Sequence, residues 1–207
     1  MNSQDVKGIL SIISGIMDEN RNYLIELDQQ NGDGDLGVSM SAGFKAASEA
    51  IKDSAETDLG QLFMAASKAF NEAAPSTLGT ILTLFFMGIA KAIRGKTEIT
   101  IEEIATAMNE GINRIMERAK SKPGEKTILD ALYPGVQGLK ESSALSFSSA
   151  FENAYIKASE GSESTRNMKS VHGRAAYFAE KSIGVLDGGS VAGKLVFEGF
   201  YNYYKEK

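Results

Sequence analysis

The sequence contains no cysteine and no tryptophan, one histidine, and only three prolines in 207 residues. Without cysteine, the chain cannot form a disulfide bond, a thiolate zinc site or a cysteine nucleophile. The one histidine, His172, has no serine and aspartate at the spacing of a catalytic triad, so neither a triad nor a histidine zinc site is favoured. Proline is scarce and strand-like alternation of apolar and polar residues is nearly absent, which indicates an all-α fold.

The chain also has no excess of basic residues: its net charge is −5 and its isoelectric point is near 5.1. A surface of this sign repels phosphate backbones and acidic lipids, so we expect neither a nucleic-acid nor a membrane partner. The most apolar run, residues 81–93, is shorter than a membrane span and contains Lys91. Residues 1–15 carry Asp5 and no basic cluster ahead of their apolar residues, which does not match a signal peptide, and we expect a cytoplasmic location.

What the sequence does contain is a series of helical patterns. The hydrophobic fraction is 43% and the charged fraction 24%, values that are ordinary for a globular protein, so residues 1–207 are predicted to form a single domain with a substantial core. Apolar residues recur at helical spacing, which predicts about eight helices. The helical patterns cover residues 6–17, a second short piece at 23–27, then 38–51, 59–70, 77–89, 100–116, about 127–139, about 150–160, 174–181 and 192–204.

Several helix starts are marked by capping residues. Thr100 and Glu103 have the spacing of a capping box, in which each side chain accepts a hydrogen bond from the other residue's backbone amide. Thr57 is predicted to cap the helix at 59–70. Ser76 and Thr77 open an almost wholly apolar helix, which is expected to be central because it has no polar face to offer water.

Two polar or glycine-rich segments are predicted to be loops. Residues 161–170 form the most polar stretch and are expected to be flexible, while residues 184–193 form a loop rich in glycine. Within the latter, Asp187 to Gly189 is either ordinary turn chemistry or a backbone cradle over a nucleotide. Arg174, which precedes it, is either a surface charge or a clamp for phosphate.

An acidic loop between two of the helical patterns is the strongest candidate for a binding site. It contains Asp28, Asp33 and Asp35 among several glycines. Carboxylates this close repel one another unless a cation lies among them, and oxygen ligands suit a hard cation. The helix that follows begins near Gly37, and its N-terminus offers free backbone amides to an anion. The loop therefore predicts a metal-assisted phosphate site.

Other interpretations of the acidic loop fit less well. Gly32-x-Gly34-x-x-Gly37 matches a dinucleotide fingerprint, but no strand precedes it and aspartates occupy two variable positions. An EF-hand requires glycine and glutamate where the chain has Leu36 and Ala42. A solvated turn rich in aspartate and glycine remains the alternative to a metal site.

Taken together, the motifs resemble a known family. Asp28-x4-Asp33-Gly34-Asp35-x-Gly37, then PGEKTILDAL at 123–132, then GRAAYFAEKSIG at 173–184 followed by Asp-Gly-Gly, are similar to the nucleotide-binding L subunits of bacterial dihydroxyacetone kinases. The motifs occur in family order over essentially the whole chain. The resemblance implies a closed barrel of eight antiparallel helices, with ADP or ATP and two Mg²⁺ ions at one end.

The resemblance also assigns roles to individual residues. The carboxylates of Asp28, Asp33 and Asp35 would hold the magnesium ions. Phosphates would be contacted at a helix start by Gly37, Val38 and Ser39, and in a second segment by Thr77 and Leu78. The base would lie beside Thr127 and Ile128. A lid made of Arg174, Asp187, Gly188 and Gly189 would cover the nucleotide.

The function implied by the resemblance is phosphoryl transfer from Mg-bound ATP to dihydroxyacetone, or a similar keto-alcohol, held on a separate K-type subunit. In one branch of the family a phosphohistidine protein of the phosphotransferase system recharges the bound ADP. The chain could also form a homodimer. The chain departs from the family pattern at Leu36, commonly histidine, and at Leu78, which offers no side-chain donor. These departures leave two alternatives: a non-catalytic nucleotide sensor, and a kinase subunit for another acceptor such as a four-carbon ketose or a fatty acid.

Overall fold

The computed structural model describes residues 1–207 and contains nine α-helices, two 3₁₀ segments and no strand, which confirms the all-α prediction. The helices are α1 (Ser3–Glu19), α2 (Arg21–Asp28), α3 (Leu36–Ile51), α4 (Leu59–Ala73), α5 (Thr77–Ala92), α6 (Ile101–Ala119), α7 (Leu129–Glu141), α8 (Phe147–Ser164) and α9 (Gly188–Glu206). The 3₁₀ segments, η1 (Thr165–Asn167) and η2 (Arg174–Ser182), connect α8 to α9.

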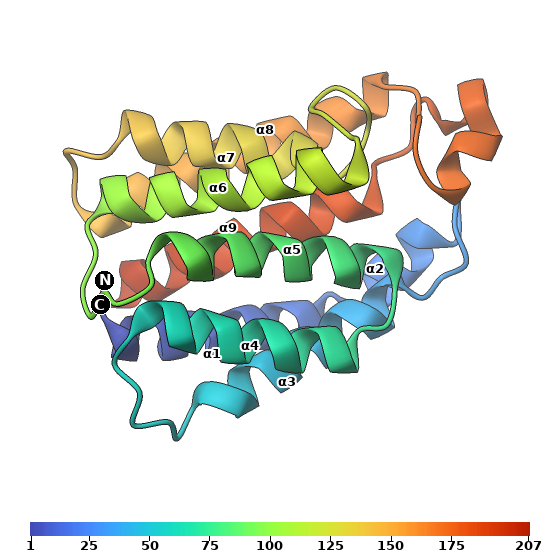
Figure 1. Cartoon of the computed structure of the whole chain (residues 1–207). Coiled ribbons are helices and arrows are strands. Elements are labelled where there is room, and N and C mark those ends of the chain that lie inside the picture. Colours follow the sequence, from blue (N-terminus) through green and yellow to red (C-terminus); the bar gives the residue numbers. More distant parts are fainter.

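The long helices form a closed barrel, as predicted. Each packs against the next in the order α1, α3, α4, α5, α6, α7, α8 and α9, and α9 packs against α1 to complete the ring. Successive helices run in opposite directions, and both chain termini lie at the same end of the barrel (Figure 1). As a consequence, α3, α5, α7 and α9 all begin at the other end, beside α2 (Figure 1).

The core is filled by apolar side chains from every helix of the ring, including several large aromatic rings. Phe44 of α3, Phe70 of α4 and Phe86 of α5 meet edge to face, with ring centroids 5.0 to 5.9 Å apart. Such pairs add about 0.5–1.5 kcal/mol to the stabilisation that burial of their area provides. The apolar residues of α5 contribute to this core, but the prediction of a central helix is wrong: α5 is one member of the ring, and its Thr80 and Lys91 are exposed.

Most of the local capping predictions are confirmed. Thr100 and Glu103 form the capping box at the start of α6, and the hydroxyl of Ser76 accepts a hydrogen bond from the amide of Gly79. The cap predicted at Thr57 is wrong by one residue. Asp58 is the N-cap of α4 because its carboxylate accepts from the first free amides of that helix.

The polar stretch 161–170 is not a loop throughout, because α8 continues to Ser164. Gly161 allows this continuation: a Cβ at this position would lie 2.0 Å from the carbonyl oxygen of Asp130, so only glycine lets α8 pass this close to α7. The last helix also starts earlier than predicted, at Gly188, with Asp187 as its N-cap. The helix predicted at 174–181 is present as η2, with a break at Ala179.

No helix in the structure combines the length and the hydrophobicity that crossing a bilayer would require.

Candidate functional site

A cleft of about 630 Å³ opens at the end of the barrel where α3, α5, α7 and α9 begin. Four connecting segments form its wall, and polar residues predominate in its lining. The residues that line it are Asp28, Asn31, Gly32, Asp33, Asp35, Leu36, Pro75, Ser76, Thr77, Leu78, Thr80, Ile81, Lys126, Thr127, Ile128, His172, Gly173, Arg174, Ala175, Asp187, Gly188 and Gly189.

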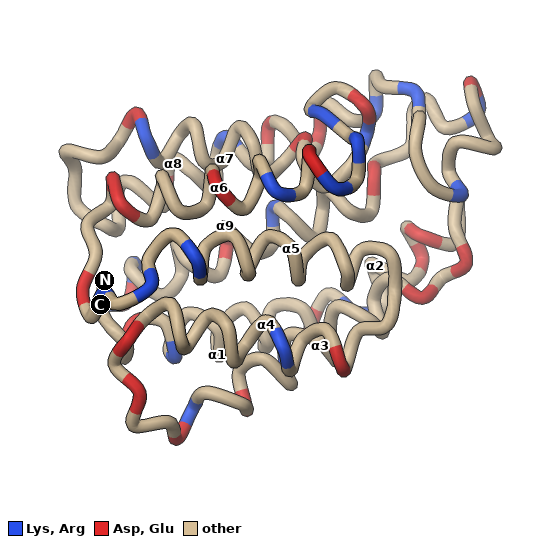
Figure 2. The backbone as a smooth tube through the Cα atoms, in the orientation of Figure 1, with Lys and Arg blue, Asp and Glu red and all other residues tan.

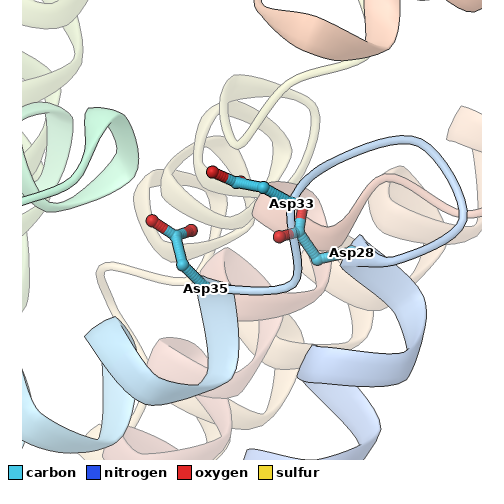
Figure 3. Close-up of side chains that lie close together, drawn as sticks. All are labelled: Asp28, Asp33 and Asp35. Atoms are coloured by element: carbon cyan, nitrogen blue, oxygen red, sulfur yellow. The ribbon is translucent and has the colours of Figure 1, made fainter.

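The acidic loop brings its three carboxylates together on one side of this cleft. One oxygen from each of Asp28, Asp33 and Asp35 lies within 4.8 Å of the others, and the side chains point into the same space (Figure 3). Gly34 shapes the loop, since its φ of 78° is accessible to glycine and its amide donates to Oδ2 of Asp28 over 2.8 Å. The loop is therefore folded around a common point to which all three carboxylates can contribute an oxygen.

The electrostatics of the loop favour a bound cation. Loss of hydration, followed by repulsion from Asp33 and Asp28, raises the pKa of Asp35 above its usual range. Figure 2 shows the acidic residues gathered at this end of the barrel, next to α2. Converging carboxylate oxygens are the donors that Mg²⁺ prefers, so the donor set fits this ion.

Two helix N-termini offer backbone amides on other sides of the cleft. At the start of α5 the amides of Thr77 and Leu78 donate to no protein atom, and at the start of α9 the same holds for Gly188 and Gly189. Free amides and the positive end of the helix dipole attract anions. The cleft thus combines a site for cations with sites for anions, as a metal-bound polyphosphate requires.

The loop before α7 is held rigidly on a third side. Asp130, which is 4% exposed, accepts hydrogen bonds from the amides of Gly124 (2.5 Å) and Thr127 (2.7 Å). This arrangement places Thr127 and Ile128 in the wall of the cleft, where Ile128 also lies close to the backbone of Gly189.

The connection between α8 and α9, residues 165–187, covers the remaining side and is called the lid segment below. Figure 1 shows it extending from the end of α8 toward the acidic loop. Two of its side chains form charged contacts with neighbouring loops: Nη1 of Arg174 lies 2.8 Å from Oδ2 of Asp33, and Nε2 of His172 lies 2.6 Å from Oε2 of Glu125. The hydrogen bond from His172, together with one from the amide of Lys122, lowers the pKa of Glu125.

Asp187 ends the lid segment and caps α9. Its carboxylate accepts a hydrogen bond from the amide of Ser190 over 2.7 Å. Burial raises its pKa to about 7, and the nearby carboxylate of Asp130 adds to the shift. The hydrogen bond from Ser190 and the positive charge of Lys126 oppose this shift without cancelling it.

All but three of the residues assigned by resemblance line this one cleft. The exceptions are Gly37, Val38 and Ser39, which lie in the first turn of α3 but not in the wall. Gly37 packs against α2, where an added Cβ would be 2.1 Å from the carbonyl oxygen of Arg21, and Ser39 is buried. Their role in phosphate binding stays a prediction.

Sequence reasoning missed several residues of the wall, of which Lys126 is the most notable. It belongs to the segment PGEKT that carried part of the resemblance, but its sequence context suggests only a polar turn. His172 gives no sequence signal beyond the absence of a triad or zinc site, because its place in the cleft wall depends on a contact with Glu125, 47 residues away in sequence.

The chain as a whole is similar to several known proteins. The family model described as the DAK2 domain matches residues 30–202. The ADP-binding subunit of the PEP-dependent dihydroxyacetone kinase of Escherichia coli (strain K12) is 31% identical over 172 residues, covering 82% of this chain and 82% of that subunit. The corresponding subunit of kinase 1 of Listeria innocua is 30% identical over 179 residues, covering 86% and 85%.

A similar fold is found in a solved structure, the dihydroxyacetone kinase of C. freundii in complex with AMP-PNP and Mg²⁺. It superposes with a TM-score of 0.75 over 95% of this chain at 20% sequence identity. This chain spans about a third of that kinase, since the match covers 33% of its length. At this identity the likeness concerns the fold alone.

Proposed function

The chain belongs to the DAK2 domain family, and we propose that it is the nucleotide-binding subunit of a dihydroxyacetone kinase-type phosphotransferase. The observation that carries the proposal is the convergence of Asp28, Asp33 and Asp35 in the same cleft as the free amides of α5 and α9. Relatives that match over most of their length are named ADP-binding subunits, which supports the same assignment.

Within this proposal the residues of the cleft divide the work of holding Mg-ADP or Mg-ATP. The three aspartates would hold the magnesium ions, which we propose to be two in number. When bound, magnesium separates the carboxylates from the polyphosphate and neutralises charge that develops during phosphoryl transfer. The amides of Thr77, Leu78, Gly188 and Gly189 would orient phosphate oxygens, which fixes the direction of transfer.

The rest of the cleft would bind and cover the nucleoside. Thr127 and Ile128 offer one hydroxyl and one apolar surface to a base. Arg174 would lie over the phosphates and, with the lid segment, keep water away from the reacting phosphoryl group. We propose that the amides of Gly37 and Val38 assist from the start of α3, with Ser39 supporting that turn.

We propose that the acceptor, dihydroxyacetone or a similar small keto-alcohol, is presented by a K-type subunit. The name of the E. coli relative describes its kinase as PEP-dependent, which supports recharging of bound ADP by a phosphohistidine protein rather than exchange for ATP. The proposal includes a cytoplasmic location, where such donors and acceptors meet.

The test is a comparison of Asp33→Asn with Asp53→Asn, an exposed aspartate in the turn after α3 at the opposite end of the barrel. In calorimetry, the parent protein and Asp53→Asn are expected to bind ADP with Mg²⁺ and to lose affinity in EDTA. Asp33→Asn should bind ADP more weakly by more than about 10-fold, the loss typical of disturbing even groups that only support metal ligands.

The same proteins are then assayed for transfer to dihydroxyacetone with a K-type subunit and a phosphohistidine donor or ATP. Asp33→Asn should lack transfer while its circular dichroism stays helical. Retained transfer in Asp33→Asn, or ADP affinity that is equal in EDTA, would refute the assignment.

A second candidate is a nucleotide sensor without transferase activity, favoured by the two leucines of the cleft wall, Leu36 and Leu78. Neither side chain can donate a hydrogen bond to phosphate. Magnesium-dependent ADP binding without transfer to any of a panel of acceptors, including a four-carbon ketose, would support the sensor over the kinase.

A further inference from the structure

Lys126 is a buried lysine whose ammonium group is surrounded by backbone carbonyls. It is 4% exposed, and its Nζ lies 2.9 Å from the oxygen of Thr165, 3.2 Å from that of Met168, and 2.6 Å from those of Ser182 and Val185. No carboxylate is within ion-pair distance of Nζ. Four carbonyls around one cation form the kind of oxygen cage that otherwise holds a metal ion or a bound ammonium.

The four carbonyls come from the two ends of the lid segment. Thr165 and Met168 lie where it leaves α8, and Ser182 and Val185 lie just before it enters α9. One ammonium group therefore binds both ends at once. The residues between them include Arg174, which reaches Asp33 across the cleft.

The ammonium group of Lys126 has no N–H donor left for any other partner. An ammonium group has three N–H bonds, and four carbonyls already share them. Burial lowers the pKa of Lys126, and the negative charge of Asp187 opposes that effect. Only the protonated form can satisfy so many acceptors, because a neutral amine has one donor fewer.

Other hydrogen bonds at the base of the lid segment join its two ends to each other rather than to the barrel. The amide of Gly184 donates to the oxygen of Arg166 over 2.7 Å, and the amide of Ser170 donates to the hydroxyl of Ser182 over 2.9 Å. Lys126 differs from these because it belongs to the loop before α7, which Asp130 fixes to the barrel.

We propose that Lys126 is a positioning residue whose ammonium, held in the four-carbonyl cage, anchors the lid segment to the barrel and thereby keeps Arg174 over the cleft. The anchoring is independent of the function proposed above, whereas its consequence for ADP rests on that function. Removal of the ammonium leaves four inward-facing carbonyls without their shared donor, so the base of the lid segment opens to water.

The first test measures the lid segment without nucleotide or metal, using Lys126→Ala and the control Lys122→Ala, an exposed lysine of the same loop. The lid segment contains four trypsin sites, at Arg166, Lys169, Arg174 and Lys181. Lys126→Ala should raise both tryptic cleavage at these sites and amide exchange in 165–187 by about 10-fold or more, while exchange in α1 to α6 stays unchanged. Lys122→Ala should match the parent protein.

The second test asks whether an ammonium group supplied from solution restores the cage. Ethylammonium or propylammonium should return Lys126→Ala toward the exchange rates and ADP affinity of the parent, whereas propanol of the same size should not. Lys126→Gln, which keeps two N–H donors without the charge, should be intermediate.

Three results would overturn the proposal. Unchanged exchange in 165–187 would show that the cage does not hold the lid segment. Weaker ADP binding with unchanged exchange would mean that Lys126 contacts the nucleotide instead. Loss of helical structure throughout the barrel in both Lys126 variants would make Lys126 a residue of the global fold. Failure of ADP to bind the parent protein would count against the proposed function but leave the exchange results interpretable.

Discussion

Arg174 and Asp33 form an ion pair across the cleft, with Nη1 of Arg174 2.8 Å from Oδ2 of Asp33. The pair joins the lid segment to one of the three carboxylates that converge on a common point. Both side chains are well exposed, at 68% and 40%, and exposed ion pairs contribute only about 0–1 kcal/mol. A divalent cation can therefore displace Arg174 from Asp33 at little cost and release the guanidinium for other anions.

The competition between Arg174 and a cation gives the first prediction. Arg174→Ala should bind Mn²⁺, as a spectroscopic substitute for Mg²⁺, up to about fivefold more tightly without nucleotide, because a weak competitor has been removed. The same variant should bind Mg-ADP more weakly, since a positive charge near the phosphates is lost.

Paramagnetic titration of Mn²⁺ and calorimetry of Mg-ADP measure the two effects. Arg94→Ala, at an exposed position near the other end of the barrel, serves as the control and should change neither. Weaker Mn²⁺ binding in Arg174→Ala would contradict the idea that the arginine competes with the ion.

A second prediction concerns the carboxyl of Asp187 in the wall of the cleft. Its pKa is raised from 3.8 to about 7 in the folded protein, so the folded state binds the extra proton between these values. Its contribution to stability is therefore fully present below about pH 4 and is lost as the pH rises through about 7. Asp187→Asn keeps a capping acceptor but does not titrate, so the stability of the parent relative to this variant should fall over that range, on the order of a few kcal/mol at most.

Urea unfolding in EDTA, without nucleotide, at a series of pH values measures this difference. The groups that face Asp187 with a charge are Asp130, Asp28 and Lys126, and they are common to both proteins. Parallel curves for the parent and Asp187→Asn between pH 4 and 7 would contradict the prediction.

A third prediction follows from the close approach of α3 to α2 at Gly37. Gly37→Ala places a Cβ 2.1 Å from the backbone oxygen of Arg21, so the start of α3 must shift, and overpacking of this kind costs about 1–3 kcal/mol. Because Asp35 is the N-cap of α3, the shift should also weaken Mg-ADP binding.

The matched control is Gly15→Ala, on an exposed face of α1 where an added Cβ meets nothing within 4 Å. This change should stabilise the protein by about 0.5–1 kcal/mol through helix propensity alone. Urea unfolding compares the two variants. Equal stability of the two variants would contradict the prediction, because it would mean that α3 can move away from Arg21 without a cost in free energy.

A fourth prediction separates stability from binding. Thr100→Ala removes one half of the capping box of α6, at the end of the barrel away from the cleft, and should cost about 1 kcal/mol. ADP affinity should not change, because no residue of α6 lines the cleft. Glu102→Ala, an exposed neighbour without a role in the capping box, should have a smaller effect on the urea midpoint. A loss of ADP affinity in Thr100→Ala would indicate coupling between the two ends of the barrel.

The sequence was most informative where a structure depends on neighbours along the chain. The capping box at Thr100, the cap at Ser76 and the acidic loop were found because the groups involved are within a few residues of one another. It was least informative at Gly161, which in isolation indicates a loop. In the structure α8 continues through Gly161, and glycine is needed there because the backbone of α7 leaves no room for a larger side chain.

By itself, then, the sequence determined the all-α class, the apolar faces of the helices and the trio of carboxylates in the acidic loop, since each is encoded by short-range spacing. Only the tertiary structure decided which loops meet at one end of the barrel. The cage around Lys126 is the clearest case, because its carbonyls lie 39 to 59 residues away and every residue type supplies the same carbonyl group. A contact made to the backbone leaves no mark on the sequence of its partner, so it becomes visible only when the chain is folded.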